Sequence, residues 1–267
     1  MLCHAATTIT GVLRSFFVAE QTAARDGFLQ SRQPLATLLG TAALLVGVVV
    51  SRDPLVVAAL APVPLALALA SSVSLRQVAA RTVPVAFASL VVVAPQAFLF
   101  PGRSLVEVAG FAVTADGLSY VVTFTLRVWT GVSLLAVLVL TTPFADVVAA
   151  LRRLRVPVAL VWVLVLTYRY LFLFFSELRR LLRAREGRTV GARGLRQRWR
   201  ELGQLSGTFL IRTLERGERV HRGMRARGGA RPPSPYDRTG ETGPTDVLFV
   251  ASAVAVAISA GVIRWLL

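Results

Sequence analysis

Lysine does not occur in this chain of 267 residues, and all 30 of its basic residues are arginines. A nucleotide-binding P-loop uses a lysine to reach the phosphates, so the chain cannot be its own P-loop ATPase. Cysteine and histidine are almost as scarce, with only Cys3, His4 and His221. These few residues exclude a disulfide scaffold and argue against a His/Cys metal site within the chain.

Charged residues are also few, at 16% of the chain, whereas 55% of the residues are hydrophobic and the mean hydropathy is +0.64. A soluble domain can neither bury nor expose so much apolar surface, so the composition predicts an integral membrane protein. No paired carboxylates, nucleophile triad or cluster of metal ligands stands out in the sequence. We therefore predict neither an enzyme active site nor a cofactor bound by this chain.

Five apolar runs are long enough to cross or nearly cross about 30 Å of hydrocarbon. They lie at residues 35–50, 54–72, 83–100, 118–140 and 247–266. The sequence therefore predicts an all-α integral membrane protein with about five transmembrane helices. Arg127, inside the fourth run, is interpreted as a side chain that reaches towards the outer interface.

Arginines in the short loops indicate the orientation of these helices. The loops at residues 51–54 and 101–117 carry one arginine each, whereas those at 71–82 and 141–157 carry two and three. Arginine-rich loops favour the cytoplasmic side, which places the amino terminus inside the cell. We predict a multi-pass protein of the bacterial inner (cytoplasmic) membrane.

A sixth apolar run covers residues 156–175, but we predict that it does not cross the membrane. Arginine-rich segments flank it on both sides, and a crossing would move one of them outside. A crossing would also place Arg169, within Thr167-Tyr168-Arg169-Tyr170, near the bilayer midplane at a cost of about 2.5–3.5 kcal/mol. The run is expected to lie partly in the interface, which leaves five spans and an external carboxyl end.

Positive charge is concentrated in residues 179–238, which hold 17 arginines and only five acidic residues. The resulting charge of +12 is most of the +16 of the whole chain, and it predicts a cytoplasmic module. The expected organisation is a cytoplasmic amphipathic segment (1–34), a four-helix transmembrane region (35–142), a module with the non-crossing apolar run and the arginine-rich helices (143–229), a linker (230–245) and a final transmembrane helix (246–267).

A long amphipathic helix is predicted inside this module, over residues 195–227. The segment contains no proline. Its apolar residues recur three or four positions apart, as on one helix face, at Trp199, Leu202, Leu205 and Phe209. Gly228-Gly229 are expected to end the helix in a left-handed cap, and the proline- and glycine-rich residues 230–245 then predict a linker.

Two stretches of the sequence are distinctive. Residues 141–176 read TTPFADVVAALRRLRVPVALVWVLVLTYRYLFLFFS, and residues 209–229 read FLIRTLERGERVHRGMRARGG. Together they resemble the transmembrane T component of energy-coupling factor (ECF) transporters, and most closely the cobalt-type Q subunit (CbiQ/EcfT family). The resemblance extends from Asp26 to the carboxyl end. It implies four membrane helices, a cytoplasmic coupling module and a final membrane helix, in that order.

That family carries two short Ala-Arg-Gly-like motifs on two coupling helices, which insert into grooves of two ATPase subunits. The resemblance places the second motif at Ala226-Arg227-Gly228 and the first at Ala184-Arg185-Glu186. Glu186 replaces the small residue that is usual in the family. An alternative alignment places the first motif at Ala192-Arg193-Gly194. The family's Asp-Pro-Arg-x-Lys element before helix one is reduced to a lone proline in Gln33-Pro34-Leu35-Ala36-Thr37.

Further residues are predicted to support the second coupling helix. They are Glu215, Glu218 and Arg219, together with Gly203 and Gly207, whose small-xxx-small spacing favours tight helix packing inside the module. Arg212, Arg216, Arg219 and Arg222 line one helix face. Two interpretations of that face stay open: a solvated face laced by glutamates, and contact with anionic membrane lipids. No aromatic platform accompanies these arginines, so nucleic acid is not an expected partner.

The resemblance implies particular partners. They are two ABC-type ATPase subunits, which bind the ATP, and a small substrate-binding membrane subunit (the S component or its cobalt-type equivalent). The chain would then be a non-catalytic coupling subunit of an importer with Co²⁺ or Ni²⁺ as cargo, a vitamin being the alternative. Two other classes stay open: a stand-alone transporter, and a membrane-anchored module that binds lipid or nucleic acid.

Overall fold

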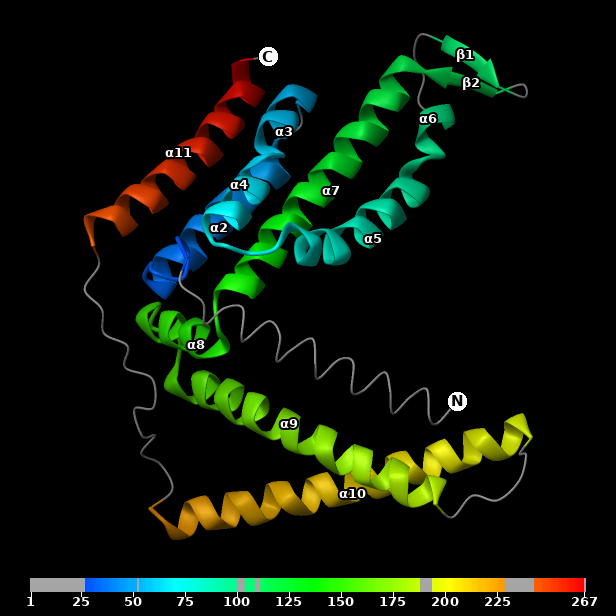
Figure 1. Cartoon of the computed structure of the whole chain (residues 1–267), viewed down its shortest axis with the longest axis vertical. Helices are drawn as coiled ribbons and strands as arrows, with labels where there is room; N and C mark the ends of the chain where they lie inside the picture. The colour runs from blue at the N-terminus through cyan, green and yellow to red at the C-terminus, as the bar shows by residue number, and fades with distance from the viewer. Residues whose placement is uncertain are drawn as a thin grey trace. The chain divides into compact units, whose positions relative to one another are not determined.

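The computed structural model describes residues 27–51, 53–99, 104–108, 111–187, 194–228 and 243–266. It confirms an all-α membrane protein, to which one small β-hairpin is added (Figure 1). The chain divides into two compact units. The α9–α10 unit takes in Leu154–Asp237, and the bundle unit takes in Ala19–Arg153 and Arg238–Leu267. Residues 1–26 of the predicted amphipathic segment and most of the predicted linker lie outside the described residues.

The bundle unit contains most of the helices. In chain order its elements are α2 (Pro34–Val50), α3 (Pro54–Leu60), α4 (Val63–Ala70), α5 (Leu75–Val93), α6 (Gln96–Leu99), β1 (Ser104–Val108), β2 (Phe111–Thr114), α7 (Ala115–Thr141), α8 (Phe144–Arg153) and α11 (Pro244–Leu266). Four helical segments of the described ranges are long and apolar enough to cross a membrane, by length and composition: Leu75–Leu99, Ala115–Thr141, Val158–Arg185 and Pro244–Gly261. The apolar segments Pro34–Val50 and Pro54–Ala70 are shorter.

The apolar run at residues 54–72 forms two short helices instead of one. α3 ends at Leu60 and α4 begins at Val63, with Pro62 between them. Proline lacks an amide hydrogen, and its ring clashes with the carbonyl group four residues earlier, so Pro62 and Pro64 interrupt the helix. The second of the predicted spans is therefore a broken helix pair.

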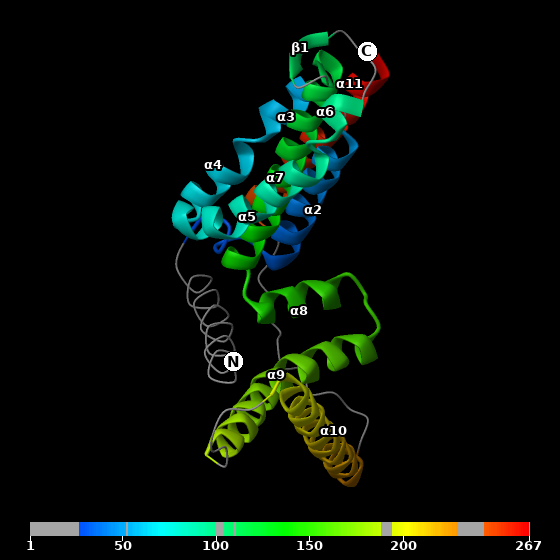
Figure 2. The same cartoon turned by 90° about the vertical axis from the view of Figure 1, so that its right-hand side faces the viewer.

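Helices distant in sequence pack together in the bundle unit. α11 packs along α2, and α5 packs along α7 (Figures 1 and 2). Side chains from four helices share one core cluster, which includes Leu44, Val48, Leu60, Leu134 and Ala253. Lipid tails are as apolar as these side chains, so close packing and internal hydrogen bonds hold the helices together.

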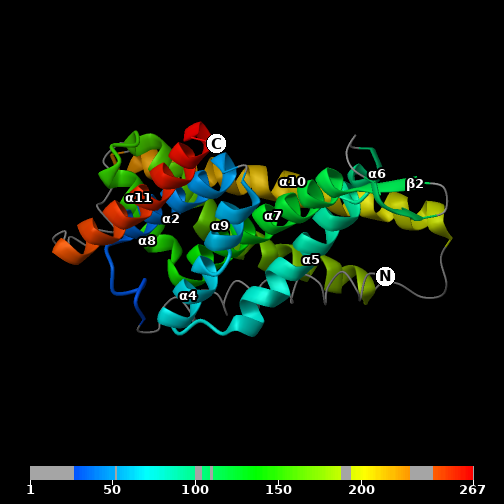
Figure 3. The same ribbon diagram turned by 90° about the horizontal axis from the view of Figure 1, so that it is seen from above.

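Two glycines let α11 approach α2 closely. A Cβ atom at Gly40 would overlap the ring of Phe249, and one at Gly47 would lie 2.9 Å from the Cα atom of Ala257. Figure 3 shows the two helices side by side. The path of α11 therefore depends on the absence of side chains at these two positions.

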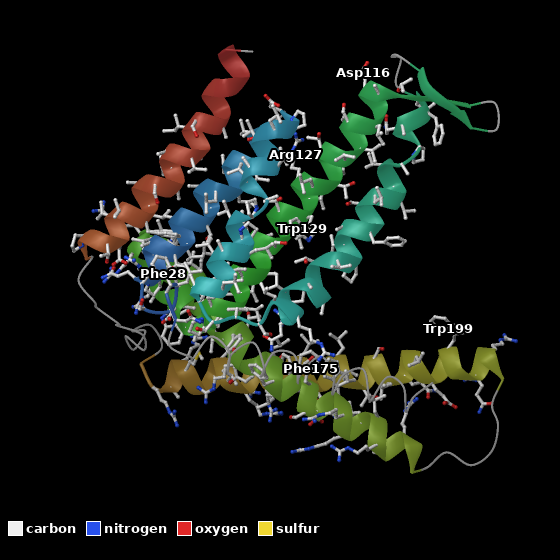
Figure 4. The ribbon with its side chains drawn as sticks, turned by 45° about the horizontal axis from the view of Figure 1, so that its top comes forward. Phe28, Asp116, Arg127, Trp129, Phe175 and Trp199 are labelled. Atoms are coloured by element: carbon white, nitrogen blue, oxygen red, sulfur yellow. The ribbon has the colours of Figure 1, made fainter. Side chains whose placement is uncertain are left out.

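Several buried polar side chains of the bundle unit find hydrogen-bond partners within the chain. Thr41, Thr130 and Thr141 are buried, and each hydroxyl donates to the carbonyl oxygen four residues earlier, at 2.7, 2.7 and 2.9 Å. Arg127 on α7 donates from Nη2 to the carbonyl oxygen of Ser51, the residue after α2. Figure 4 shows Arg127 on the side of α7 that faces α2 and α3. The side chain expected to reach the interface thus caps the end of a neighbouring helix.

The hairpin between α6 and α7 was not predicted from the sequence. β1 and β2 pair antiparallel, with Glu107 opposite Ala112 and Val108 opposite Phe111. Thr114 then caps α7, because its Oγ1 accepts a hydrogen bond from the Gly117 amide at 3.2 Å. The hairpin therefore ends where the long helix α7 begins.

The close approach of α2 and α11 can be tested at Gly47. We expect Gly47→Ala to lower the free energy of unfolding by about 1–3 kcal/mol, because the new methyl group overlaps the α11 backbone. Gly131→Ala is the matched control, since a Cβ atom there would meet Leu45 Cδ1 at an ordinary 3.5 Å. Thermal unfolding in detergent measures both variants. Equal stability of the two would contradict the close contact.

Candidate functional site

The predicted coupling residues lie on two long helices of the α9–α10 unit. α9 (Val158–Glu186) is apolar in its first half and basic in its last turns, and α10 (Leu195–Ala226) carries arginines along its length. The two helices cross, as Figures 1 and 2 show. The predicted helix over residues 195–227 is confirmed to within one residue.

Apolar contacts hold the crossing of α9 and α10. Leu205 on α10 is only 6% exposed, and Leu182 on α9 is buried as well. Phe174 and Phe209 meet edge to face, with ring centroids 6.1 Å apart. Such aromatic pairs add roughly 0.5–1.5 kcal/mol beyond the area that they bury. The crossing therefore has a small apolar centre of its own.

An ion pair lies beside this apolar centre. Arg212 on α10 donates from Nη1 to Glu177 Oε1 on α9 at 2.6 Å. Arg180 adds a second, longer contact to the same carboxylate at 3.9 Å. Both helices line a pocket of about 270 Å³ next to the pair. Glu177 thus provides a carboxylate that pairs with two arginines on an arginine-rich surface.

The first predicted motif, Ala184-Arg185-Glu186, forms the last turn of α9. Arg185 turns towards α10, where Nη1 donates to the carbonyl oxygen of Glu201 and Nη2 lies 3.3 Å from Gln204 Oε1. This arginine therefore ties the two helices together. In the alternative motif, Gly194 precedes the first residue of α10, while Ala192 and Arg193 lie outside the described residues.

The second predicted motif, Ala226-Arg227-Gly228, forms the end of α10. Ala226 is the last helical residue, and Gly228 has φ +89°, which confirms the predicted left-handed cap. The side chain of Arg227 is exposed, and among the described residues no acidic group pairs with it. Its guanidinium group, with five donors, is presented at the tip of the helix.

The two motifs lie far apart on the unit. Arg185 contacts α10 at Gln204, and Arg227 lies 23 residues further along the same helix. A rise of 1.5 Å per residue separates the two points by about 35 Å along the helix axis. The structure therefore does not bring the two motifs together.

The residues predicted to support the second motif fall into two groups. Arg219 pairs with Glu215 at 3.7 Å and Arg222 with Glu218 at 3.9 Å, and all four side chains are more than half exposed. Exposed pairs of this kind contribute about 0–1 kcal/mol each. The two pairs fit the interpretation of a face laced by glutamates, and contact with anionic membrane lipids stays a prediction.

Gly203 and Gly207 depart from the expected tight packing. A Cβ atom at either position would have no described atom within 4 Å. Trp199, 68% exposed, and Leu210, 58% exposed, lie on the same face of α10 as these glycines. Figure 4 shows Trp199 on the side of α10 away from α9. The spacing of Trp199 and Leu210 in the sequence could have predicted this exposed apolar face of α10. It lies beside the apolar face that contacts α9.

Comparison with known proteins identifies the family. The sequence model of the cobalt transport protein family, CbiQ, matches residues 27–236. This chain belongs to the CbiQ family. The matched region includes both predicted motifs and all of α9 and α10. The resemblance drawn from residues 141–176 and 209–229 is thereby confirmed.

Three relatives can be named beside the CbiQ family model. An uncharacterized protein of Methanocaldococcus jannaschii is 31% identical over 211 residues, which cover 76% of this chain and 72% of the relative. The cobalt transport protein CbiQ of Rhodobacter capsulatus is 32% identical over 150 residues, 54% of this chain and 61% of the relative. A second uncharacterized protein of Methanocaldococcus jannaschii is 32% identical over 124 residues, 46% of each chain.

The apolar centre of the α9–α10 crossing can be tested at Leu205. We expect Leu205→Ala to lower the free energy of unfolding of the unit by about 2–5 kcal/mol, because it leaves a cavity between the helices. Spin labels at Arg183→Cys and Thr208→Cys, in a background without Cys3, should show a broadened distance distribution. Leu210→Ala, on the exposed face, should change the stability by less than about 0.5 kcal/mol. Similar effects of both substitutions would contradict the assigned contact.

Proposed function

We propose that this chain is the energy-coupling transmembrane (T) subunit of an ATP-driven ECF-type importer. Membership of the CbiQ family supports the transport role. The observation that carries the coupling role is the separation of the two motifs. Arg227 is exposed at one end of α10, and Ala184-Arg185-Glu186 meets the same helix about 35 Å away. Two separate helix ends that carry the motifs match two ATPase subunits, one at each end.

The proposed role is mechanical and non-catalytic. The two ABC-type ATPase subunits bind and hydrolyse the ATP, and their closure displaces α9 and α10. The displaced helices act on a small substrate-binding membrane subunit, which releases its cargo inside the cell. Arg227 serves this role by donating hydrogen bonds to carboxylate or carbonyl oxygens in an ATPase groove, and Gly228 ends the helix without strain.

The proposed cargo is Co²⁺, with Ni²⁺ as the closest alternative. The family description and the name of the Rhodobacter capsulatus relative support a cobalt role. The proposal assigns recognition of the ion to the substrate-binding partner. Within the described ranges, no group of three or more His, Cys, Asp or Glu side chains gathers closely enough to hold a metal ion.

The proposal places the protein in the bacterial inner membrane, with α9 and α10 on the cytoplasmic side. α9 is long and apolar enough to cross a membrane, but arginines lie on both sides of its apolar half. Arg169 is an exposed residue near the middle of that half. A partly interfacial α9 keeps all of these charges in contact with water or lipid headgroups.

Docking of the ATPases is tested with Arg227→Ala in the complex expressed with its genomic neighbours. We expect wild-type protein to recover ABC-type ATPases and a small membrane protein, whose identity names the cargo. Arg227→Ala should weaken ATPase binding by about 1–3 kcal/mol, because the lost hydrogen bonds are charged. Arg225→Ala removes the same charge from another face of α10 and should bind normally. Unchanged binding in Arg227→Ala would reject the assigned contact, and failure of wild-type protein to recover an ATPase would reject the T-subunit role.

The orientation of α9 is tested by cysteine labelling in intact cells, in a background without Cys3. Arg155→Cys before α9 and Ser206→Cys on α10 should both be protected from a membrane-impermeant reagent and react after permeabilisation. Ser119→Cys, at the opposite end of α7, should react in intact cells. If only one of positions 155 and 206 is protected, α9 crosses the membrane.

A further inference from the structure

A nearly buried ion pair joins the start of α2 to the start of α11. Arg32 Nη1 lies 3.7 Å from Asp246 Oδ1, and their side chains are only 14% and 8% exposed. The Arg32 guanidinium also lies over the ring of Phe28, 4.5 Å from its centroid. Figure 4 shows Phe28 where these two helices begin. The arginine is therefore held by a carboxylate and by an aromatic face, both of which favour its charge.

Asp246 also fixes the first turn of α11. Its Oδ2 accepts a hydrogen bond from the Gly243 amide at 3.2 Å, as the third residue of a capping box does. One turn later, Phe249 meets Phe28 edge to face, with centroids 6.3 Å apart, and fills the space above Gly40. Capping and ring contacts thus secure the end of α11 to which Arg32 is paired.

The neighbouring residue, Gln33, secures a second element. Its Oε1 accepts a hydrogen bond from Arg153 Nη1, and Arg153 is the last residue of α8. Gln33 is 8% exposed, and α8 packs on α2. Two consecutive residues, Arg32 and Gln33, therefore hold α11 and α8 against the same short segment before α2.

The contacts of Arg32 and Gln33 lie where the chain passes between the two compact units. The chain leaves the bundle unit after Arg153 and re-enters it at Arg238, so α8 and the segment before α11 are two of the places where the bundle unit connects to the α9–α10 unit. We propose that Arg32-Gln33 is a clamp that fixes the bundle at these two connections, at the end of α8 and at the start of α11. The clamp residues are positioning residues, which act through α8 and α11 and touch neither ATP nor cargo.

This inference rests on the proposed T-subunit function and adds a site to it. Where the chain leaves and re-enters the bundle, a loosely held helix end would absorb a displacement that the α9–α10 unit passes on through the chain. A clamp on these two connections transfers the movement to α11 and α8. Loss of the ion pair would leave ATP hydrolysis intact and lower the transport obtained from it.

The test uses the complete transporter in proteoliposomes, with ⁵⁷Co²⁺ uptake and ATP hydrolysis measured on the same sample. Asp246→Asn keeps an acceptor for the Gly243 amide and removes the charge that faces Arg32. We expect unchanged ATP hydrolysis and about fivefold or greater loss of uptake per ATP, the lower range of coupling between sites. Arg32→Gln should cause a similar loss, and the double variant should be no worse than either single one.

Asp53→Asn is the matched control, because Asp53 also caps a helix and the substitution leaves the Arg32 pair untouched. It should retain wild-type uptake per ATP. Wild-type uptake per ATP in Asp246→Asn and Arg32→Gln, or additive losses in the double variant, would overturn the clamp. Absence of ATPase binding by wild-type protein would instead overturn the proposed function, so the two failures are distinct. If Arg32→Gln does not assemble, Asp246→Asn alone decides.

Discussion

Hydrocarbon offers no hydrogen-bond partner to a buried amide or hydroxyl group, and the bundle unit is built around this constraint. The hydroxyl groups of Thr41, Thr130 and Thr141 donate hydrogen bonds to backbone carbonyl oxygens of their own helices. Where the backbone must leave a helix, between α2 and α3, the Ser51 carbonyl oxygen accepts from Arg127 of α7. The Arg127 side chain and the carbonyl oxygen at the end of α2 thus satisfy each other, and this hydrogen bond ties α7 to the turn between α2 and α3.

The helices were predictable because their signals lie within short stretches of the sequence. The run at 118–140 and the apolar spacing from Trp199 to Phe209 each follow from local sequence, and Gly228 marks the helix end by its backbone freedom alone. The hairpin at residues 104–114 was missed, because its two strands are short and only their pairing with each other makes them strands. Pairing partners are not visible in a single local pattern.

The candidate site was predicted less completely than the fold. The position of Arg227 at a helix tip follows from the glycine after it. The contact of Arg185 with Gln204 depends instead on how α9 and α10 cross, which no spacing within either helix determines. For Gly203 and Gly207 the sequence predicted a contact that the structure does not contain. Their spacing permits close helix packing, but nothing in the described chain packs against them. The two similar motifs therefore differ: Arg185 is hydrogen-bonded within the chain, whereas Arg227 is exposed.

The glycine contact between α2 and α11 has a consequence for biosynthesis. α2 is made early and α11 only after the whole α9–α10 unit, so the face of α2 around Gly40 and Gly47 stays without its partner throughout that interval. The bundle cannot close until the arginine-rich helices have left the ribosome. The bundle unit is therefore completed only after the part proposed to receive the ATPases has been synthesised.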